Sequence, residues 1–251
     1  MKHIIVYSFL AGALALSSCK SSYSVELLEG GRIPVTAAFD QSSDETAAEI
    51  LSTYKAKVDS IMCPVIGHSQ KKLASFRPES PLSNFMADLL RIGAEKELGV
   101  KPEIGVMNMG GIRNIINPGA ITIGEIYEIC PFQNALSMVT LRGDALLELF
   151  EQIAALHGEG LSGAELVISE DGKLLSARVG SKQIDPKEEY RIATIDYIAA
   201  GNDHMEAFKK AVDKVEPEDA ILRDIFIDYV KDCEARGRMI DAKVEGRITV
   251  K

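Results

Sequence analysis

One stretch of the chain joins a long amphipathic helix to a short strand and then to a glycine-rich turn. Ser80 precedes Pro81, and a proline at the first helical position after a serine cap is typical of a helix start. Apolar residues at helical spacing continue from there to Gly99, which predicts a helix over 81–98. The next apolar run, 103–107, predicts a strand. The core is therefore expected to contain helices and strands together.

The remaining segments mix helical and strand patterns. Helical spacing of apolar residues predicts further helices near 45–62, 123–130, 143–156, 203–213 and 217–236. Strands are predicted near 65–67, 135–141, 164–168, 174–179, 190–197 and 244–250. A doubly wound parallel sheet requires strands and helices to alternate regularly, and this order does not. We therefore predict an α+β fold, with a mixed sheet and packed helices, in one domain over 45–251.

The charge balance excludes one broad class of partner. The 251 residues include 28 lysines and arginines against 37 aspartates and glutamates, for a net charge of −9. Non-specific binding to nucleic-acid phosphates requires a surplus of cationic side chains, so nucleic acid is not an expected partner. At 46% hydrophobic residues, the composition is that of a folded protein rather than a disordered chain.

The first residues have the features of an export signal. A basic residue provides a positive start, and the apolar run 4–16 is too short to span a bilayer. The run ends in Leu16-Ser17-Ser18-Cys19, which resembles the lipobox of bacterial lipoproteins, in which the cysteine is acylated. We predict a signal peptide over 1–18, a lipid anchor on Cys19 and a membrane tether over 19–44. The alternative is an ordinary secretory signal with a chance cysteine; either way, we expect an exported protein of the cell envelope, on its periplasmic or surface side.

Three further cysteines, Cys63, Cys130 and Cys233, are widely spaced. In an oxidising compartment this odd number allows at most one internal disulfide. The sequence has no Cys-x-x-Cys pair, and scattered cysteines are more often small buried apolar residues than metal ligands. We assign them no chemistry.

A segment with two adjacent glycines follows the strand predicted over 103–107. It consists of Asn108-Met109-Gly110-Gly111-Ile112-Arg113. Glycines allow backbone amides to approach a ligand, and the planar guanidinium suits phosphate or hydroxyl oxygens. The same six residues are also compatible with an ordinary β-turn that carries an exposed arginine.

Two other segments place an aromatic residue at a strand end. One is Pro131-Phe132-Gln133-Asn134, and the other is 196–203, which contains Tyr197 and Asp203. Two aromatic faces can hold a planar base between them, and stacking is worth about 1–3 kcal/mol per base. Taken singly, each aromatic fits burial in the core better, and spacing alone does not pair them.

Taken together and in this order, the segments resemble the C-terminal, substrate-binding domain of the 5'-nucleotidase and UDP-sugar hydrolase family. The matching stretches are ESPLSNFMAD at 79–88, NMGGIR at 108–113, PGAIT at 118–122, PFQN at 131–134, YRIAT at 190–194 and DYIAAGND at 196–203. Each match is short, but the ordered set extends over most of the predicted domain. The resemblance implies the fold of that domain and a site for the nucleoside part of a nucleotide.

The resemblance also implies roles for individual residues. Phe132 and Tyr197 match the aromatics that hold the base, and Arg113 matches the arginine near phosphate and ribose. Asp203 matches the ribose-binding carboxylate, and Asn108 matches the asparagine that opens the glycine motif. The predicted substrate-binding set is Asn108, Gly110, Gly111, Arg113, Phe132, Asn134, Tyr197 and Asp203. A carboxylate for hydroxyls and a cation for phosphate are what a nucleotide requires.

The chain departs from the family pattern at several positions. Met109 replaces one glycine of the Asn-Gly-Gly-Gly-Ile-Arg motif, and Asn202 and His204 replace glycines of Gly-Gly-Asp-Gly. The backbone is therefore expected to reach positive φ less readily beside the ligand, with lower affinity. Arg77 is out of register with a further substrate arginine of the family, so no role is carried over to it. Asn84 is expected to cap or pack its helix rather than bind ligand.

The pattern lacks the catalytic part of the family. In the family a separate metallophosphatase domain holds two metal ions that activate water. After the predicted signal the chain has only His68, His157 and His204, without a His-x-His or Asp-x-His motif. We predict no catalytic residue, metal ligand or cofactor in this chain, with His204 exposed rather than a ligand beside Asp203. The divalent metal pair is expected on a partner.

Three functions remain open at this point. The leading one is the nucleotide-binding half of a split 5'-nucleotidase, which acts in nucleotide catabolism with a separately encoded metallophosphatase and hydrolyses nothing quickly alone. The second is a stand-alone lipoprotein that binds a nucleoside or nucleotide for uptake. The third is a relic with only a structural role.

Overall fold

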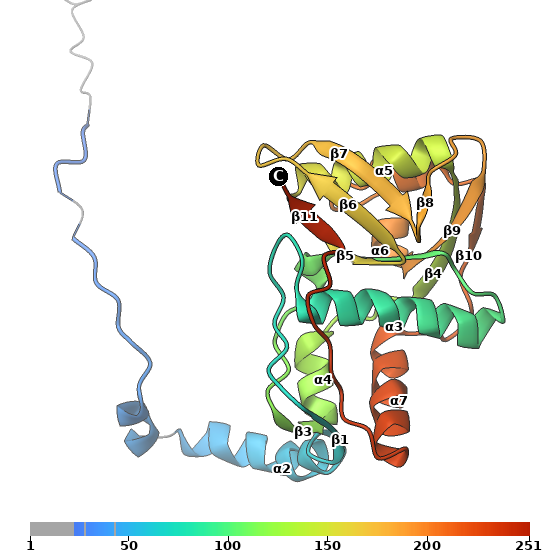
Figure 1. Ribbon diagram of the computed structural model, residues 1–251. Helices are drawn as coiled ribbons and strands as arrows, with labels where there is room; N and C mark the ends of the chain where they lie inside the picture. Colours follow the sequence, from blue (N-terminus) through green and yellow to red (C-terminus); the bar gives the residue numbers. More distant parts are fainter. Residues whose placement is uncertain (1–22, 28, 43) are drawn as a thin grey trace, which may run out of the picture. The chain divides into compact units, whose positions relative to one another are not determined.

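The structure, a computed structural model, describes residues 23–251 except 28 and 43 (Figure 1). The chain consists of two units, the first ending at Leu51 and the second extending from Ser52 to Lys251. The predicted signal peptide and Cys19 lie outside the described residues. The predicted limits of the tether and the domain stay predictions.

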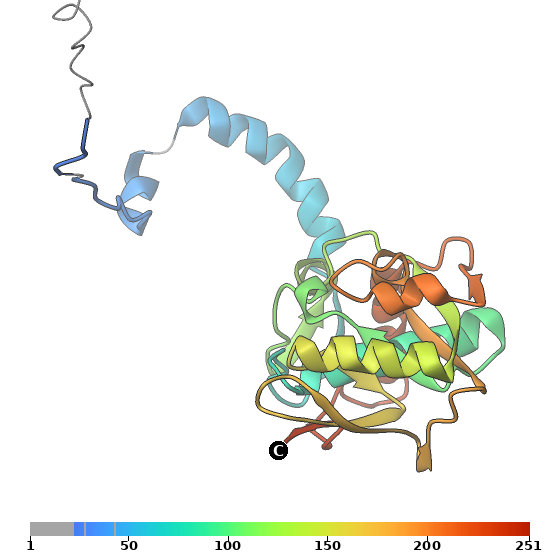
Figure 2. The ribbon, with the colours of Figure 1, turned by 90° about the horizontal axis from the view of Figure 1, so that it is seen from above.

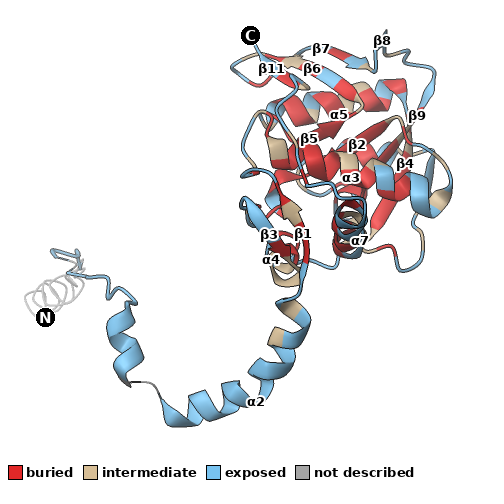
Figure 3. Cartoon of the chain, turned by 60° about the horizontal axis from the view of Figure 1, so that its bottom comes forward, coloured by how far each residue is buried: buried red, intermediate tan, exposed pale blue. Residues whose placement is uncertain are grey.

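The N-terminal elements are two exposed helices. The 3-10 helix η1 (Ala37–Ser42) belongs to the first unit. The helix α2 (Glu45–Met62) ends before Pro64, as predicted, and has no buried residue (Figure 3). Among the helices of the described residues, none combines the length and the apolar character that a membrane crossing requires.

A five-stranded sheet forms the centre of the second unit. Its order is β10 (Asp213–Val215), β4 (Leu136–Arg142), β9 (Glu189–Ile195), β2 (Ile104–Met107) and β5 (Gly160–Ser162). β2 and β9 run parallel, with Ile104 opposite Ile192, and the other neighbours are antiparallel. The sheet is therefore mixed, and with its helices it confirms the predicted α+β fold.

Helices cover both faces of this sheet. α3 (Pro81–Leu98) packs on one face and α5 (Gly143–Ala155) on the other (Figure 1). All of β2 is buried, as a strand covered on both faces requires. α3 approaches β2 closely because Gly105 has no side chain: a Cβ there would lie 2.3 Å from the Ala87 carbonyl oxygen.

The caps of α3 explain where it begins and ends. The Ser80 hydroxyl accepts a hydrogen bond from the Ser83 N–H, and the Ser83 hydroxyl accepts one from the Ser80 N–H in return. Gly99 ends the helix in the left-handed conformation, with φ of 67°. Both predicted limits of this helix are confirmed.

A second sheet of four strands lies over α5. Its order is β11 (Ile248–Val250), β6 (Ala164–Ile168), β7 (Leu174–Val179) and β8 (Lys182–Gln183). β6 and β7, which match two of the predicted strands, form a hairpin that runs alongside α5 in Figure 2. α5 therefore lies between two sheets, which explains its strongly apolar sequence.

Four further elements pack together beside α3. They are the antiparallel ribbon β1 (Val65–Ser69) and β3 (Gly119–Thr122), α4 (Ile123–Ile129) and α7 (Leu222–Ala235). α7 contacts β1, α3 and α4. Thr122 and Glu125 form a capping box at the start of α4. The first turn of α7 lies next to the residues that follow α4, because Arg223 bonds to the Cys130 carbonyl.

The prediction of a helix near 203–213 is wrong. Only the 3-10 helix η3 (Glu206–Lys210) forms there, and the last residue of that range, Asp213, begins β10. Asp203 and His204 have φ of 52° and 62°, a left-handed conformation that a right-handed helix excludes.

The helix predicted near 217–236 begins later than expected. α7 starts at Leu222, because Asp219 is left-handed, with φ of 59°. The strand predicted over 190–197 ends at Ile195, where α6 (Asp196–Ala199) begins.

Several strands are shorter than predicted or were not predicted. The last strand, β11, covers only the end of the predicted 244–250. β3, β5, β8 and β10 have between two and four residues each. Segments this short contain too little periodic pattern to be recognised, and their strand conformation depends on the neighbour with which they pair.

Candidate functional site

Strand directions bring the three predicted segments to one edge of the five-stranded sheet. β2 and β9 are parallel, so their carboxyl ends lie at the same edge. β4 is antiparallel to β9, with Leu136 opposite Ile195, so the amino end of β4 lies there too. The segments 108–113, 196–203 and 131–134 adjoin these three ends. Residues far apart in the sequence therefore meet at one place.

The three segments enclose a pocket of about 370 Å³. Its lining consists of Asn108, Gly110, Gly111, Arg113, Phe132, Asn134, Tyr197 and Asp203, which is the complete set predicted from the sequence. The volume falls within the roughly 300–1,000 Å³ of small-molecule sites. The structure thus brings all eight residues together, and their binding of a substrate stays a prediction.

Asp203 connects two walls of this pocket. Its Oδ2 accepts a hydrogen bond of 2.6 Å from the Asn108 amide, and its Oδ1 accepts one of 3.1 Å from the Tyr197 hydroxyl. The bond to Asp203 raises the pKa of the Tyr197 phenol, because it stabilises the protonated form. The Asn202 amide donates to the Tyr197 carbonyl at 2.7 Å, which holds the turn closed.

The two aromatic side chains are not core residues. Phe132 is 49% exposed and Tyr197 is 44% exposed, so burial in the core is wrong for both. The guanidinium carbon of Arg113 lies 6.0 Å from the centre of the Phe132 ring, and its Nη1 donates to the Gly110 carbonyl at 3.0 Å. Large apolar surface left open to solvent beside polar groups is typical of a ligand site.

Arg223 supports the Phe132 segment from beneath and was missed by the sequence analysis. It is 7% exposed, and its Nη1 donates to the carbonyls of Cys130 and Pro131 at 3.3 Å each. Its guanidinium carbon lies 3.9 Å from the centre of the Tyr127 ring. The carbonyls at a helix end and the aromatic face stabilise a buried cation. No local pattern distinguishes this arginine from its neighbours in the sequence.

Glu159 supports the glycine segment and was also missed. Its buried carboxylate accepts hydrogen bonds from the Met109 N–H and from Arg77. Arg77 does not line the pocket, and no substrate role was expected for it. The only sequence signal for Glu159 is that it lies between two glycines, Gly158 and Gly160.

Asn84 lies in the packed part of α3. It is 2% exposed, and its amide donates to Glu79 at 2.5 Å and to the Lys243 carbonyl at 3.0 Å. These contacts are those of the packing role expected for it, and Asn84 is not part of the pocket at the sheet edge.

A protein-family model described as "5'-nucleotidase, C-terminal domain" matches residues 65–210, which is more than half of the chain. The chain belongs to the 5'-nucleotidase C-terminal domain family. The matched residues include every element that contributes to the pocket.

Two curated proteins are similar to this chain in sequence. The chain is 28% identical over 231 residues to the trifunctional nucleotide phosphoesterase protein YfkN of Bacillus subtilis, covering 83% of this chain and 15% of that protein. It is 27% identical over 175 residues to a 5'-nucleotidase of Vibrio cholerae, covering 67% and 31% respectively. The chain thus spans less than a third of the length of these two curated relatives.

A solved 5'-nucleotidase has the same fold. The structure of a 5'-nucleotidase precursor from Thermus thermophilus superposes with a TM-score of 0.70 at 28% identity. The superposition covers 82% of this chain and 43% of the other.

Within the described residues, this 5'-nucleotidase C-terminal domain has no group of three or more His, Cys, Asp or Glu side chains that could hold a metal ion. The Nδ1 atom of His68 lies 3.1 Å from Oε2 of Glu234. Neither residue lines the pocket. His204 is exposed, in agreement with the expectation, but it occupies a left-handed turn rather than the start of a helix. These residues do not fit a two-metal centre.

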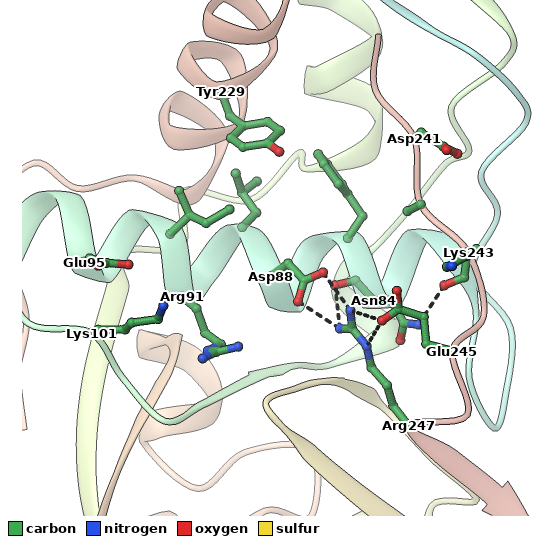
Figure 4. Close-up of a pocket in the computed structure, with 14 residues that line it drawn as sticks. Asn84, Asp88, Arg91, Glu95, Lys101, Tyr229, Asp241, Lys243, Glu245 and Arg247 are labelled. Atoms are coloured by element: carbon green, nitrogen blue, oxygen red, sulfur yellow. Dashed lines mark hydrogen bonds and ion pairs between the residues drawn. The ribbon is translucent and has the colours of Figure 1, made fainter. Parts of the chain in front are cut away.

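A larger cleft of the domain contains none of the predicted site residues. It has a volume of about 470 Å³ and lies between α3 and the segment 241–247 (Figure 4). Arg247 lines it and is 2.8 Å from both Asp88 and Glu245, so these three charges pair with one another. The pocket at the sheet edge, which contains all eight predicted residues, is the better candidate site.

Proposed function

We propose that the pocket binds the nucleoside part of a nucleotide, and that the chain is the substrate-recognition half of a split 5'-nucleotidase. The observation that carries this proposal is the position of Asp203 in one pocket with two exposed aromatic rings and Arg113. This combination of groups matches the parts of a nucleotide one by one.

Each group has a chemical counterpart in the ligand. The Asp203 carboxylate retains acceptor capacity for the ribose hydroxyls after its two internal bonds. Phe132 and Tyr197 offer faces on which a base stacks. Arg113 offers a planar, permanently charged fork for the phosphate side. The Asn108 Oδ1 is buried and without a partner in the described part of the chain, which makes it an acceptor for a ligand donor.

The catalytic part of the reaction is assigned to a partner. Hydrolysis of a phosphate ester by this family's chemistry needs a metal pair that activates water, and the described residues do not fit such a centre. We therefore place the metals on a separately encoded metallophosphatase, with this chain providing base and ribose recognition in nucleotide catabolism.

We also propose that the protein is exported and held at a membrane by a lipid on Cys19. The lipobox-like residues 16–19 support this assignment. A relative from Listeria monocytogenes, 27% identical over 240 residues, is a cell wall protein, and the alignment covers 84% of this chain and 30% of that protein. Mass spectrometry of the protein from its own membranes tests the anchor, since an unmodified N-terminal peptide would contradict it.

Reconstitution tests the split enzyme. The protein is mixed with the metallophosphatase encoded nearest to it, and hydrolysis of AMP is followed with divalent metal present. A rate well above the sum of the separate rates is expected. The Phe132→Ala, Tyr197→Ala double variant should lose that gain while it remains folded. No gain with two folded proteins would overturn the proposal.

A stand-alone binder for uptake is the second candidate. It is favoured by one observation, that a single chain supplies all eight pocket residues. Micromolar binding of a nucleoside without any partner, together with no gain in hydrolysis on mixing, would favour this candidate. If the double variant changes neither ligand binding nor partner activity, only a structural role remains.

A further inference from the structure

Glu159 lies beside the pocket without lining it. The next residue, Gly160, pairs with Met107 at the end of β2, so Glu159 stands next to the start of the glycine segment. Its side chain is only 3% exposed. Gly158 allows the segment that contains Pro78 to approach closely, because a Cβ at Gly158 would lie 2.2 Å from the Pro78 carbonyl oxygen. The fold therefore places one buried carboxylate directly beneath the site.

The two oxygens of this carboxylate have different partners. Oε2 accepts a hydrogen bond from the Met109 backbone N–H, and Oε1 accepts one from Nη2 of Arg77. Nε of Arg77 also donates to the Gly158 carbonyl at 2.9 Å. A buried carboxylate is tolerated when it is paired and hydrogen-bonded in this way. Glu159 is thus fixed on one side and holds the glycine segment on the other.

The bond to Met109 fixes the peptide group that directly follows Asn108. Met109 begins the 3-10 turn η2 (Met109–Gly111), and the first N–H groups of a helical turn have no partner within it. An asparagine cap reaches the second or third N–H of the turn with its side-chain oxygen, not the first, so the Met109 N–H depends on Glu159. Asn108 makes no side-chain cap bond, and its amide donates to Asp203.

We propose that Glu159 is a positioning residue for the nucleotide site. It binds the Met109 N–H and so fixes the peptide group next to Asn108, in the position from which the Asn108 amide binds Asp203 and its Oδ1 is available to a hydroxyl or amino group of the ligand. This inference rests on the proposed binding of a nucleoside, and it adds a residue that touches no ligand itself.

A double-mutant cycle tests the action of Glu159 through Asn108. Binding of adenosine is measured by calorimetry for Glu159→Ala, Glu159→Gln, Asn108→Ala and the Glu159→Ala, Asn108→Ala double variant. Glu159→Ala should weaken binding by about tenfold, the effect of one lost hydrogen bond to a charged group. Glu159→Gln should bind nearly as well as the wild type, because its amide oxygen can still accept the Met109 N–H. Glu165→Ala, at an exposed residue of β6, is the matched control.

The double variant decides between positioning and general stability. If Glu159 acts through Asn108, the double variant should bind no more weakly than Asn108→Ala alone. Unchanged affinity in Glu159→Ala, or losses that add in the double variant, would overturn the inference. Circular dichroism establishes that each variant is folded.

An NMR measurement on the ligand-free protein tests the role of Glu159 independently of the proposed function. In the ligand-free protein, Glu159→Gln should move the Met109 amide resonance, since its acceptor changes from a carboxylate to an amide, and should leave the Asn108 side-chain resonances in place. A Met109 amide that does not move would overturn the inference, even if Glu159→Ala fails to fold. Absence of adenosine binding in the wild type would instead contradict the proposed function.

Discussion

The Asn108 amide donates a hydrogen bond of 2.6 Å to Oδ2 of Asp203, and this bond joins the loop after β2 to the loop after β9. The other oxygen of Asp203 accepts the Tyr197 hydroxyl at 3.1 Å. One carboxylate therefore holds two other side chains of the pocket in place before any ligand arrives, which reduces the ordering that binding would require.

Removal of the Asp203 charge should impair binding while the fold stays intact. Asp203 is left-handed, with φ of 52°, and asparagine tolerates that conformation, so Asp203→Asn changes the charge without straining the backbone. We expect adenosine affinity to fall by about 10- to 100-fold, as for hydrogen bonds to charged groups. Calorimetry measures the effect, and Asp213→Asn, at an exposed residue of β10, is the control. Equal affinities for both variants and the wild type would contradict a ribose-binding role.

The aromatic rings should contribute to affinity much more than to stability. Phe132→Ala and Tyr197→Ala should each reduce binding by about 1–3 kcal/mol through lost stacking, and both side chains are half exposed. Tyr197→Phe keeps the ring and loses only the bond to Asp203, so it should retain most of the affinity. Tyr54→Ala, at an exposed aromatic of α2, is the control. If Tyr197→Phe loses as much affinity as Tyr197→Ala, stacking is not the source of the contribution of Tyr197 to binding.

The stability of the protein should depend on pH through Glu159. Burial raises the pKa of its carboxyl, while the Met109 N–H and Arg77 oppose that shift and Asp203 adds to it. The folded state then holds the proton more tightly than the unfolded state, so the contribution to stability is present below the ordinary glutamate range and is lost as pH rises through the raised pKa. In Glu159→Gln this loss is absent. The unfolding free energy of the variant relative to the wild type should therefore increase between about pH 4 and about pH 7.

Urea unfolding at several pH values measures this difference. Glu165→Gln, at a side chain that is 58% exposed, is the matched control. A difference for Glu159→Gln that stays flat with pH would contradict the raised pKa.

Arg223 should be important for folding in spite of having no acidic partner among the described contacts. Arg223→Met removes both bonds to the carbonyls after α4 and the contact with Tyr127. We expect a loss of about 1–3 kcal/mol in the free energy of unfolding, because the carbonyl of the buried Cys130 is left without this donor. Arg236→Met, which breaks an exposed ion pair with Asp232, should cost at most about 1 kcal/mol. Urea denaturation compares them, and equal effects would contradict a supporting role for Arg223.

The cysteines should differ sharply in reactivity. Cys63 is exposed, whereas Cys130 and Cys233 are buried, and burial raises the pKa of the Cys130 thiol to about 12. Because the thiolate is the reactive form, a thiol reagent near pH 8 should modify Cys63 quickly and the other two only on unfolding. The assay uses a Cys19→Ser form, with Cys63→Ser as the control that abolishes the fast phase. A second fast thiol would contradict the buried positions.

The local structure of this protein follows from short-range signals in its sequence. Ser80, Pro81 and Gly99 fix the ends of α3, because capping groups and a left-handed glycine act within one turn of the chain. Thr122 and Glu125 do the same for the start of α4. The pocket residues could likewise be named in advance, since they belong to short ordered motifs.

Only the tertiary structure decided how those motifs meet and what supports them. The parallel pairing of β2 with β9 brings Asn108 to Asp203, and no local pattern specifies which strands pair. Glu159 and Arg223 could not be recognised beforehand, because their function depends on partners from distant segments. The sequence determined which groups are present and how each turn begins and ends; long-range packing determined which of them face one another, because that depends on burying several elements at once.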